Sequence, residues 1–466
     1  MTGRYKAYPE YKESGVEWLG KVPQTWSIHS LKRTIDRVTN GIWGSEPDSK
    51  NDLIVLRVAD FNRNQLNISD DKLTFRAIEP KDRASRLLKK GDLLIEKSGG
   101  GDKTLVGCVV LFDKDYPAVT SNFVAKMTPK KGFDSSFLRY AFSQLYTGKV
   151  NFPSIKQTTG IQNLDSDAYL QESFVFPSYE EQQKIANFLD HETAKIDTLI
   201  TKQEKLIELL KEKRQAVISH AVTKGLNPNA PMRDSGVEWL GEVPEHWGSS
   251  TVKNLCYVND GNHGEEYPTE SDFVDNRDGV PFIRAGDFDN LKIIENDLRY
   301  ISHKKNDSMR KGRLQEGDIL FVNRGATIGK LCIVDAPYAG SNLNSQIAYL
   351  RCNTNLADHR YVTYFLSSPY IQTKILAAIQ GGALPQYPLK HIVNLDIWHG
   401  NIEEQKAISN FLDNKTNKIK GLIEKSELAI NLMKERKTAL ISAAVTGKID
   451  VRDFVSEQGQ PQGVQG

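Results

Sequence analysis

Two long segments of the chain place apolar residues at a spacing that alternates, with interruptions, between three and four residues. The first covers residues 180–220, contains no proline or glycine, and carries Ile185, Leu189, Ile196, Leu199, Leu206, Leu210 and Val217. The second carries Ile408, Leu412, Ile419, Leu422, Ala429, Met433 and Leu440. This spacing predicts two long amphipathic helices that pack against each other. Because Glu192, Gln203 and Lys213 interrupt the first apolar seam, the predicted coiled coil is imperfect.

The region before each helix has a strand-rich pattern. Short runs rich in Val, Leu and Ile, bounded by Gly, Asp, Asn and Lys, predict strands in the first half at residues 52–61, 91–98 and 105–112, and in the second half at 280–288, 317–325 and 330–336. Helical periodicity follows at 137–145 and 360–366. We therefore expect an α+β globule in each half of the chain.

The chain is an internal repeat. Residues 13–26 (ESGVEWLGKVPQTW) recur at 234–247 (DSGVEWLGEVPEHW) with 10 of 14 positions identical, and residues 180–190 recur at 403–413 with 8 of 11 identical. A two-fold repeat of this size indicates two similar modules with a pseudo-two-fold arrangement, and not a solenoid. Such an arrangement should bring the N-terminal arm close to the GKIDVRD segment near the C-terminus.

The repeat divides the chain into a series of segments. They are an N-terminal arm with a first WLG segment (1–26), a first globule (27–178), a first helix (179–226), a linker with a second WLG segment (227–247), a second globule (248–400), a second helix (401–449) and a C-terminal tail (450–466). Trp18, Leu19, Trp239 and Leu240 in the WLG segments are expected to attach each globule to the helices, with partner docking as the alternative. The tail after Val455 is expected to be disordered.

Composition limits the possible functions. The length of 466 residues allows two to four domains, and a formal net charge of +2 gives no direct sign of a polyanion partner. The four cysteines are far apart and form no C-x-x-C pair, which argues against a disulfide framework or a zinc ribbon. The absence of a signal peptide and of long apolar runs predicts a cytoplasmic protein without a membrane span.

Catalytic motifs are missing from the sequence. The segment GATIGK at 325–330 is similar to a Walker A loop, but it has one residue too few between its glycines and a leucine where Ser or Thr would bind magnesium. The nine histidines show no zinc-binding spacing, and no Rossmann fingerprint or serine-hydrolase elbow is present. We therefore expect neither a bound cofactor nor a metal in this chain.

Polar loops at matched positions in the two halves are the candidate binding sites. A glycine-rich loop follows a strand in each half, and a second polar loop comes late in each globule. Such loops bring N–H groups close to phosphates, while Gln and Asn read adenine edges and Arg or Lys read guanine. The alternative is an ordinary surface turn. The candidate residues are Lys97, Ser98, Gly99, Gly100, Lys103, Thr104, Lys156, Gln157, Thr158, Gln162 and Asn163 in the first half, and Asn323, Arg324, Thr327, Lys330, Gln380, Gln386 and Tyr387 in the second.

Over essentially its full length, the sequence resembles the specificity subunits of type I DNA restriction-modification systems. The motifs that carry this resemblance are the tyrosine-rich arm with the WLG segment at 8–26 and its recurrence at 234–247, the FxxPxxEEQ helix entry at 174–182, and the AVTKG and AVTGKID helix ends at 221 and 444. One departure is visible, because Pro177 before the first helix is matched by Gly400 before the second. The second helix is therefore expected to start less rigidly.

The resemblance implies a non-catalytic reader of double-stranded DNA with two target recognition domains. It implies two methyltransferase subunits and two endonuclease subunits as partners, and these would carry S-adenosylmethionine, ATP and magnesium. We expect an asymmetric bipartite target whose non-specific spacer is set by the helices. The alternatives are a self-contained methyltransferase or nuclease, and a coiled-coil scaffold without a DNA role.

Overall fold

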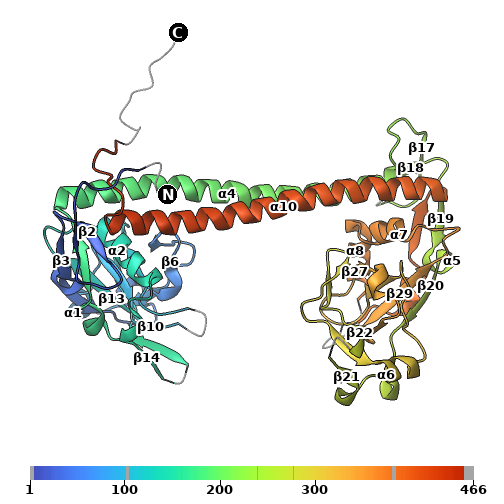
Figure 1. Cartoon of the computed structure of the whole chain (residues 1–466), viewed down its shortest axis with the longest axis horizontal. Helices are drawn as coiled ribbons and strands as arrows, with labels where there is room; N and C mark the ends of the chain where they lie inside the picture. Colours follow the sequence, from blue (N-terminus) through green and yellow to red (C-terminus); the bar gives the residue numbers. More distant parts are fainter. Residues whose placement is uncertain are drawn as a thin grey trace, which may run out of the picture. The chain divides into compact units, whose positions relative to one another are not determined.

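The chain folds into two compact α+β units. A computed structural model describes residues 5–100, 104–158, 160–238, 240–275, 278–379 and 385–455, apart from the side chain of Thr158. Unit 1 combines residues 1–203 with 428–466, and unit 2 consists of residues 204–427. The long helices α4 (Tyr179–Lys224) and α10 (Ile402–Val445) each begin in one unit and end in the other (Figure 1). The predicted fold class of two tandem α+β modules with two long helices is confirmed.

Unit 1 is built on an antiparallel sheet whose strands, in sheet order, are β11 (Val109–Leu111), β9 (Leu93–Glu96), β13 (Val124–Pro129) and β4 (Ile35–Asn40). A second sheet has the order β12 (Ala118–Thr120), β5 (Asp52–Leu56) and β8 (Phe75–Ala77), with β12 parallel to β5. Helix α2 (Ser135–Thr147) buries Phe137, Leu138 and Phe142 in the core of the unit. The predicted strands and the predicted helix of the first globule are thus present.

Unit 2 repeats this architecture. Its main sheet has the order β20 (Cys256–Asp260), β29 (Ile347–Cys352), β26 (Ile319–Val322) and β27 (Leu331–Ile333). Its second sheet has the order β21 (Phe273–Val274), β25 (Arg299–Ser302), β22 (Gly279–Ile283) and β28 (Asn342–Leu343), with β28 parallel to β22. Helix α7 (His359–Leu366) takes the place of α2 and precedes α8 (Pro369–Ala377). The internal repeat is therefore a repeat of sheet topology.

The two long helices run antiparallel, because within each unit the start of one packs against the end of the other. In unit 1, Ile185 and Leu189 of α4 share a core with Leu440 and Val445 of α10. In unit 2, Ile408 and Leu412 of α10 share a core with Ile218 and Val222 of α4. The same sequence motif thus makes the same contact twice.

The predicted apolar seam is partly wrong. Leu199, Leu206 and Leu422 are 50%, 42% and 50% exposed, although the spacing assigned them to the interface. Ile200 and Ile207 are less exposed than these leucines. Because the heptad passes through positions 196, 200, 203, 207 and 210, each predicted leucine lies one residue, or about 100°, away from the seam. Gln203 lies on the seam, as predicted, while the apolar positions on either side of it are Ile200 and Ile207.

Each WLG segment packs against the end of a long helix. Leu19 and Trp26 are buried with Ala444 and Val445, while Leu240 and Trp247 are buried with Ala221 and Val222. Trp18 is 36% exposed and its ring stacks on Phe174. Leu19 and Leu240 therefore attach the globules to the helices as predicted, while Trp239 lies outside the described residues.

The N-terminal arm pairs with the segment after α10. Lys6 forms an antiparallel bridge with Asp450, the Tyr11 hydroxyl donates to the Gly447 carbonyl at 3.0 Å, and the Lys448 amine donates to the Lys21 carbonyl at 2.6 Å. The predicted proximity of these two segments is confirmed. The tail after Val455 lies outside the described residues.

The start of α10 is capped in spite of Gly400. The Asn401 side chain accepts a hydrogen bond from the Glu404 N–H at 2.9 Å, as Ser178 does from Glu181 at 3.3 Å before α4. A Cβ at position 400 would collide with the Glu404 carboxylate. Because this clash is with the end of a flexible side chain, it does not by itself require glycine, and the expectation of a less rigid helix start stays a prediction. Among the described residues, no helix is long and apolar enough to cross a membrane.

Candidate nucleic-acid interface

In unit 1 the two predicted loops join into one small sheet. β10 (Ser98–Gly99) pairs with β15 (Ile161–Leu164), which pairs in turn with β14 (Ile155–Thr158). Ser98 lies opposite Asn163, and its hydroxyl donates to the Asn163 side-chain oxygen at 2.5 Å. β10 and β14 lie on the side of the globule away from α4 (Figure 1). Segments about sixty residues apart in the chain thus form a single polar surface.

The exposed side chains of this surface include those of Thr104, Lys156, Gln157, Ile161 and Asn163. Lys156 is 76% exposed and its amine lies 3.1 Å from the Asp165 carboxylate. Gly100 has a φ of 68°, and a Cβ there would lie 2.7 Å from the Thr104 carbonyl oxygen, so the turn requires glycine. Lys103 lies outside the described residues, as does the side chain of Thr158.

In unit 2 the described parts of the two loops are joined by an antiparallel bridge. Arg324 pairs with Gln386, and the Gly325 N–H donates to the Pro385 carbonyl at 2.9 Å. Gln386 and Thr327 are exposed, while the Lys330 amine lies 5.2 Å from the centre of the Phe288 ring. Gln380 lies outside the described residues. The structure thus brings the predicted loops together in both units.

The same backbone hydrogen bonds hold the glycine-rich loop in each unit. In unit 1 the N–H groups of Lys97 and Ser98 donate to the Phe123 carbonyl at 2.8 and 3.3 Å. In unit 2 the N–H groups of Asn323 and Arg324 donate to the Gln346 carbonyl at 3.0 and 3.3 Å. The backbone frame is therefore shared, and the side chains that it carries differ.

Three of the predicted site residues are buried within this frame. Gln162 is 5% exposed and its side-chain oxygen accepts a hydrogen bond from the Val106 N–H at 3.1 Å. Tyr387 is 2% exposed and stacks on Phe321, and Asn323 is 1% exposed. In this structure these side chains hold the loops in place, and the neighbouring exposed residues face solvent.

A second glycine loop at matched positions completes the frame, and the sequence reasoning missed it. Asn40 ends β4 and is followed by Gly41, and Asp260 ends the equivalent strand β20 and is followed by Gly261. A Cβ at Gly41 would collide with the Ser121 carbonyl, and one at Gly261 with the Asn344 carbonyl. The sequence could have revealed this loop, because the segments NGIWG at 40–44 and DGNHG at 260–264 occupy the same place in the repeat.

The residue before this glycine anchors a cation in each unit. In unit 1 the Lys97 amine donates to the Asn40 side-chain oxygen at 2.6 Å. In unit 2 the buried Asp260 carboxylate is surrounded by Lys311, His263 and Arg324, with side-chain distances of 2.5, 2.9 and 4.0 Å. We call these three residues the basic cluster. It carries more positive charge than its single carboxylate can neutralise, which favours an anionic partner.

Hydrogen bonding keeps Asp260 ionised. Burial raises the pKa of this carboxyl, but the hydrogen bonds from Lys311 and His263 outweigh burial and hold the pKa below its usual value. Behind the corresponding loop of unit 1, Glu96 is fully buried and pairs with Arg63 at 2.7 Å. There burial is the largest effect, and the pKa of Glu96 is raised.

Comparison with known proteins identifies the family. The family model described as the type I restriction modification DNA specificity domain matches residues 48–209 and 244–431. The chain belongs to this family. It is a type I specificity subunit, the non-catalytic component that gives such a system its DNA sequence specificity.

Relatives agree with this assignment. The putative type I restriction enzyme MjaX specificity subunit of Methanocaldococcus jannaschii is 23% identical over 95% of this chain and 98% of its own length. The EcoBI specificity subunit of Escherichia coli is 26% identical over 63% of this chain and 61% of its own.

Solved structures share the fold. A chain from a study of complex assembly and conformational transition of the type I R-M system has a TM-score of 0.69 at 14% identity, covering 91% of this chain and 98% of that one. The HsdS subunit from Thermoanaerobacter tengcongensis has a TM-score of 0.54 at 15% identity, covering 92% of this chain and 98% of that one.

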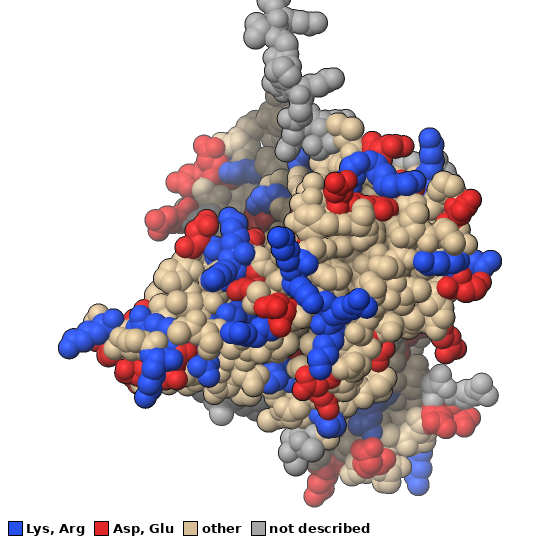
Figure 2. Space-filling model, turned by 90° about the vertical axis from the view of Figure 1, so that its left-hand side faces the viewer, with Lys and Arg blue, Asp and Glu red and all other residues tan. Residues whose placement is uncertain are grey.

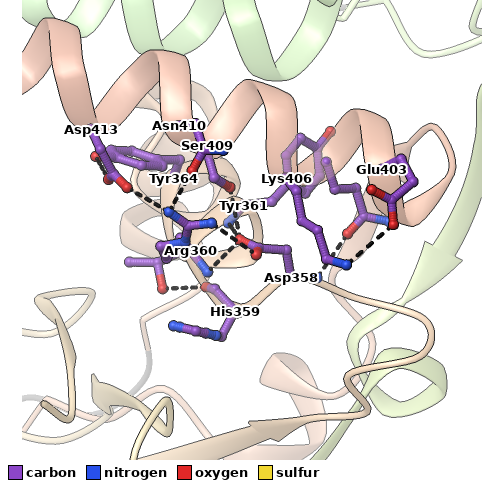
Figure 3. Close-up of polar contacts among 12 residues, drawn as sticks. Asp358, His359, Arg360, Tyr361, Tyr364, Glu403, Lys406, Ser409, Asn410 and Asp413 are labelled. Carbon is purple, nitrogen blue, oxygen red and sulfur yellow. Dashed lines mark hydrogen bonds and ion pairs between the residues drawn. The ribbon is translucent and has the colours of Figure 1, made fainter. Parts of the chain in front are cut away.

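In this specificity subunit each recognition globule is attached to a long helix by a polar network. Figure 3 shows the network of unit 2, where Arg360 reaches Asp413 at 2.8 Å and Tyr364 donates to the same carboxylate at 2.7 Å. Asp358 accepts from the Ser409 hydroxyl at 2.8 Å. In unit 1 the corresponding carboxylate binds a tyrosine and an arginine from α2, namely Asp190 with Tyr140 and Arg139.

The surface of the specificity subunit carries both charge signs. On the face of unit 1 that Figure 2 shows, Lys and Arg side chains are interspersed with Asp and Glu. Among the residues that the structure describes, no group of three His, Cys, Asp or Glu side chains could hold a metal ion. Local clusters, and not the net charge of +2, are therefore the features that favour nucleic acid.

Proposed function

We propose that each unit reads one half of an asymmetric, bipartite target in double-stranded DNA, with residues 27–178 and 248–400 as the two recognition domains. The observation that supports this is the shared backbone frame with different side chains on it. Lys97 and Asn40 in unit 1 stand where unit 2 has Asn323 and Asp260. Two recognition domains that share a backbone frame but carry different side chains on it would prefer different base sequences.

The side chains at or beside these loops are suited to contacts with DNA. Arg324 can bind guanine through both ends of its guanidinium group, and Gln157 or Gln386 can bind adenine in the same way. Phe123 is 55% exposed beside the loop of unit 1 and offers an apolar contact for a thymine methyl group. Lys156 and Lys311 are suited to phosphates, which give affinity and orientation without sequence information.

The long helices are proposed to set the non-specific spacer between the half-sites. Helix α4 has 46 residues and is therefore about 70 Å long at 1.5 Å per residue. If the two domains dock about one helical turn of DNA apart, the spacer is roughly 5 to 8 base pairs. Insertion of about four residues near Thr201 should lengthen the spacer and leave both half-sites unchanged, and an unchanged spacer would contradict the proposed role.

Repeated exposed leucines support two copies of one partner protein. Leu199 and Leu422 are equivalent in the repeat and each is 50% exposed, and Leu209 and Leu432 are equivalent and 49% and 55% exposed. Each unit carries one leucine of each pair. We propose two adenine methyltransferase subunits at these helix faces and two ATP-dependent endonuclease subunits in the full complex. S-adenosylmethionine, ATP and magnesium would be bound by those partners.

Exchange of one recognition domain tests the proposal. Residues 27–178 are replaced by the same region of a relative with a different target, and the reciprocal chimera exchanges residues 248–400. Each chimera, expressed with its methyltransferase partner, should change one half of the methylated motif only. A change in both halves after either exchange would overturn the assignment of one domain to each half-site.

A further inference from the structure

Two cysteines of unit 2 face each other across neighbouring strands. Cys256 of β20 lies opposite Cys352 of β29 in the antiparallel register, and their Sγ atoms are 3.0 Å apart. The Asn353 N–H donates to the Leu255 carbonyl at 2.9 Å, which makes the cysteines a non-hydrogen-bonded pair. At such positions the Cα atoms are about 4.5 Å apart, a separation at which a disulfide forms without backbone movement.

The other cysteines have no such neighbour. Cys108 is 3% exposed and Cys332 is fully buried, and each lies in a separate apolar cluster. Burial raises the pKa of Cys108 to about 11. Cys352, in contrast, is only half-buried, and Cys256 is 5% exposed directly beside it. Of the two cysteines, Cys352 is therefore the one that we expect a reagent to meet first, with the second thiol already in place beside it.

We propose that Cys256 and Cys352 form a reversible oxidation site that a small-molecule disulfide converts into an intramolecular disulfide. The Cys352 thiolate attacks one sulfur of the reagent and releases one small thiol, leaving a mixed disulfide. The Cys256 thiolate then attacks the Cys352 sulfur and releases the second small thiol. The two cysteines lose two electrons and two protons, and the reagent is reduced to two thiols.

The surroundings of Cys352 determine how the reaction depends on pH. The hydrogen bond with Cys256 and burial both raise the pKa of the Cys352 thiol, so the thiol form dominates at neutral pH. Because the thiolate is the nucleophile, oxidation should be slow at pH 7 and accelerate as the pH rises. In a reducing environment the site stays a dithiol.

The disulfide would reinforce the sheet that carries the unit 2 interface. β20 ends at Asp260, which anchors the basic cluster, and β29 begins directly after Gln346, which holds the glycine-rich loop. The cysteines lie at the opposite ends of both strands, away from these loops. In the equivalent strand pair of unit 1, Ile35 faces Pro129 across a register shift. Oxidation should therefore stabilise unit 2 and leave unit 1 unchanged.

Mass spectrometry of the full-length chain tests this site. The folded protein is incubated with glutathione disulfide at pH 8, alkylated and digested. We expect a loss of about 2 Da, a cross-linked peptide pair containing Cys256 and Cys352, and reversal by dithiothreitol. The melting temperature of the oxidised chain should rise by several degrees, on the order of 5 °C.

Cysteine variants provide the controls. A Cys108→Ser/Cys332→Ser double variant should still form the cross-link, whereas Cys256→Ser should take up one glutathione on Cys352 and stop there. If the wild-type chain keeps all four thiols alkylatable, or if the cross-link joins another pair, the proposal is wrong. Because this readout is a peptide mass, it does not depend on DNA binding or on partner subunits.

Discussion

Replacing Asp260 by asparagine perturbs the interface of unit 2 at its centre. Asp260 is 6% exposed, and its carboxylate lies 4.0 Å from the Arg324 guanidinium and 2.5 Å from the Lys311 amine. Unit 1 has Asn40 at the equivalent position, where it accepts from the Lys97 amine at 2.6 Å. The substitution therefore keeps the size of the side chain and removes one charge from a position at which the fold already accepts an amide.

The distances give the expected magnitude. Two unit charges 4 Å apart attract by about 1 kcal/mol in water and about 4 kcal/mol at an effective dielectric constant of 20. Since the Arg324 side chain is 33% exposed, the value for this pair should be about 1 to 2 kcal/mol. Without the Asp260 carboxylate, the Arg324 guanidinium can attract a DNA phosphate instead. DNA binding should therefore strengthen by roughly 5- to 30-fold at low salt.

The assay is a DNA titration of the complex with its methyltransferase partner at several salt concentrations. One more neutralised phosphate steepens the slope of log K against log salt by about 0.9. Asp260→Asn should therefore show a steeper slope, and the reciprocal Asn40→Asp, a matched control in unit 1, should show a shallower one. Unchanged slopes for both variants would refute the reasoning that these positions control cations at the DNA interface.

The ionisation of Asp260 also predicts a pH dependence of stability. Its pKa is held below the usual value in the folded chain, so its contribution is present at neutral pH and is lost as the pH falls below about 4. Asp260→Asn should remove this contribution. The free energy of unfolding of the variant should then depend less on pH between about 5 and 3 than that of the wild type.

Further substitutions test the fold and the partner surface. Asp358→Ala removes the cap of α7 and leaves the buried Ser409 hydroxyl without its acceptor, so it should lower the free energy of unfolding by about 2 to 3 kcal/mol. Asp134→Ala removes only the cap of α2 and should lower it by about 1 kcal/mol. Equal losses in denaturant titrations would contradict the assigned contacts. Gly421→Ala, at a helical position with open space around it, should stabilise the chain by about 0.5 to 1 kcal/mol, and a lower melting temperature would count against this. Leu199→Glu with Leu422→Glu should abolish co-purification of the methyltransferase without changing the melting temperature, and retained binding would exclude these helix faces.

The sequence was sufficient to predict the elements and their repetition. Long helices without proline, short apolar strands and the WLG segments depend on local pattern, and the repeat gave each prediction a second, independent occurrence. The predicted seam was wrong at Leu199 and Leu206, because the neighbouring Ile200 and Ile207 take the less exposed positions on either side of Gln203. Where two adjacent residues are both apolar, as Leu199 and Ile200 are, spacing alone does not decide which of them faces the partner helix.

Individual site residues were harder to predict, because their surroundings come from distant parts of the chain. Gln162 and Tyr387 were grouped with their exposed neighbours, and only the folded loops reveal that both are buried. Asp260 was missed since its cationic partners lie up to about sixty residues away. The glycines at 41 and 261 could have been found, because they occupy equivalent places in the two halves.

The methylated motif in cells that express this chain with its methyltransferase partner tests the central claim most directly. Sequencing that detects modified bases across the genome reads this motif without any assumption about the structure. Two different short half-sites, separated by roughly 5 to 8 unspecified base pairs, are the predicted result. A continuous motif or a palindromic one would contradict the proposal that the two units read different halves of one target.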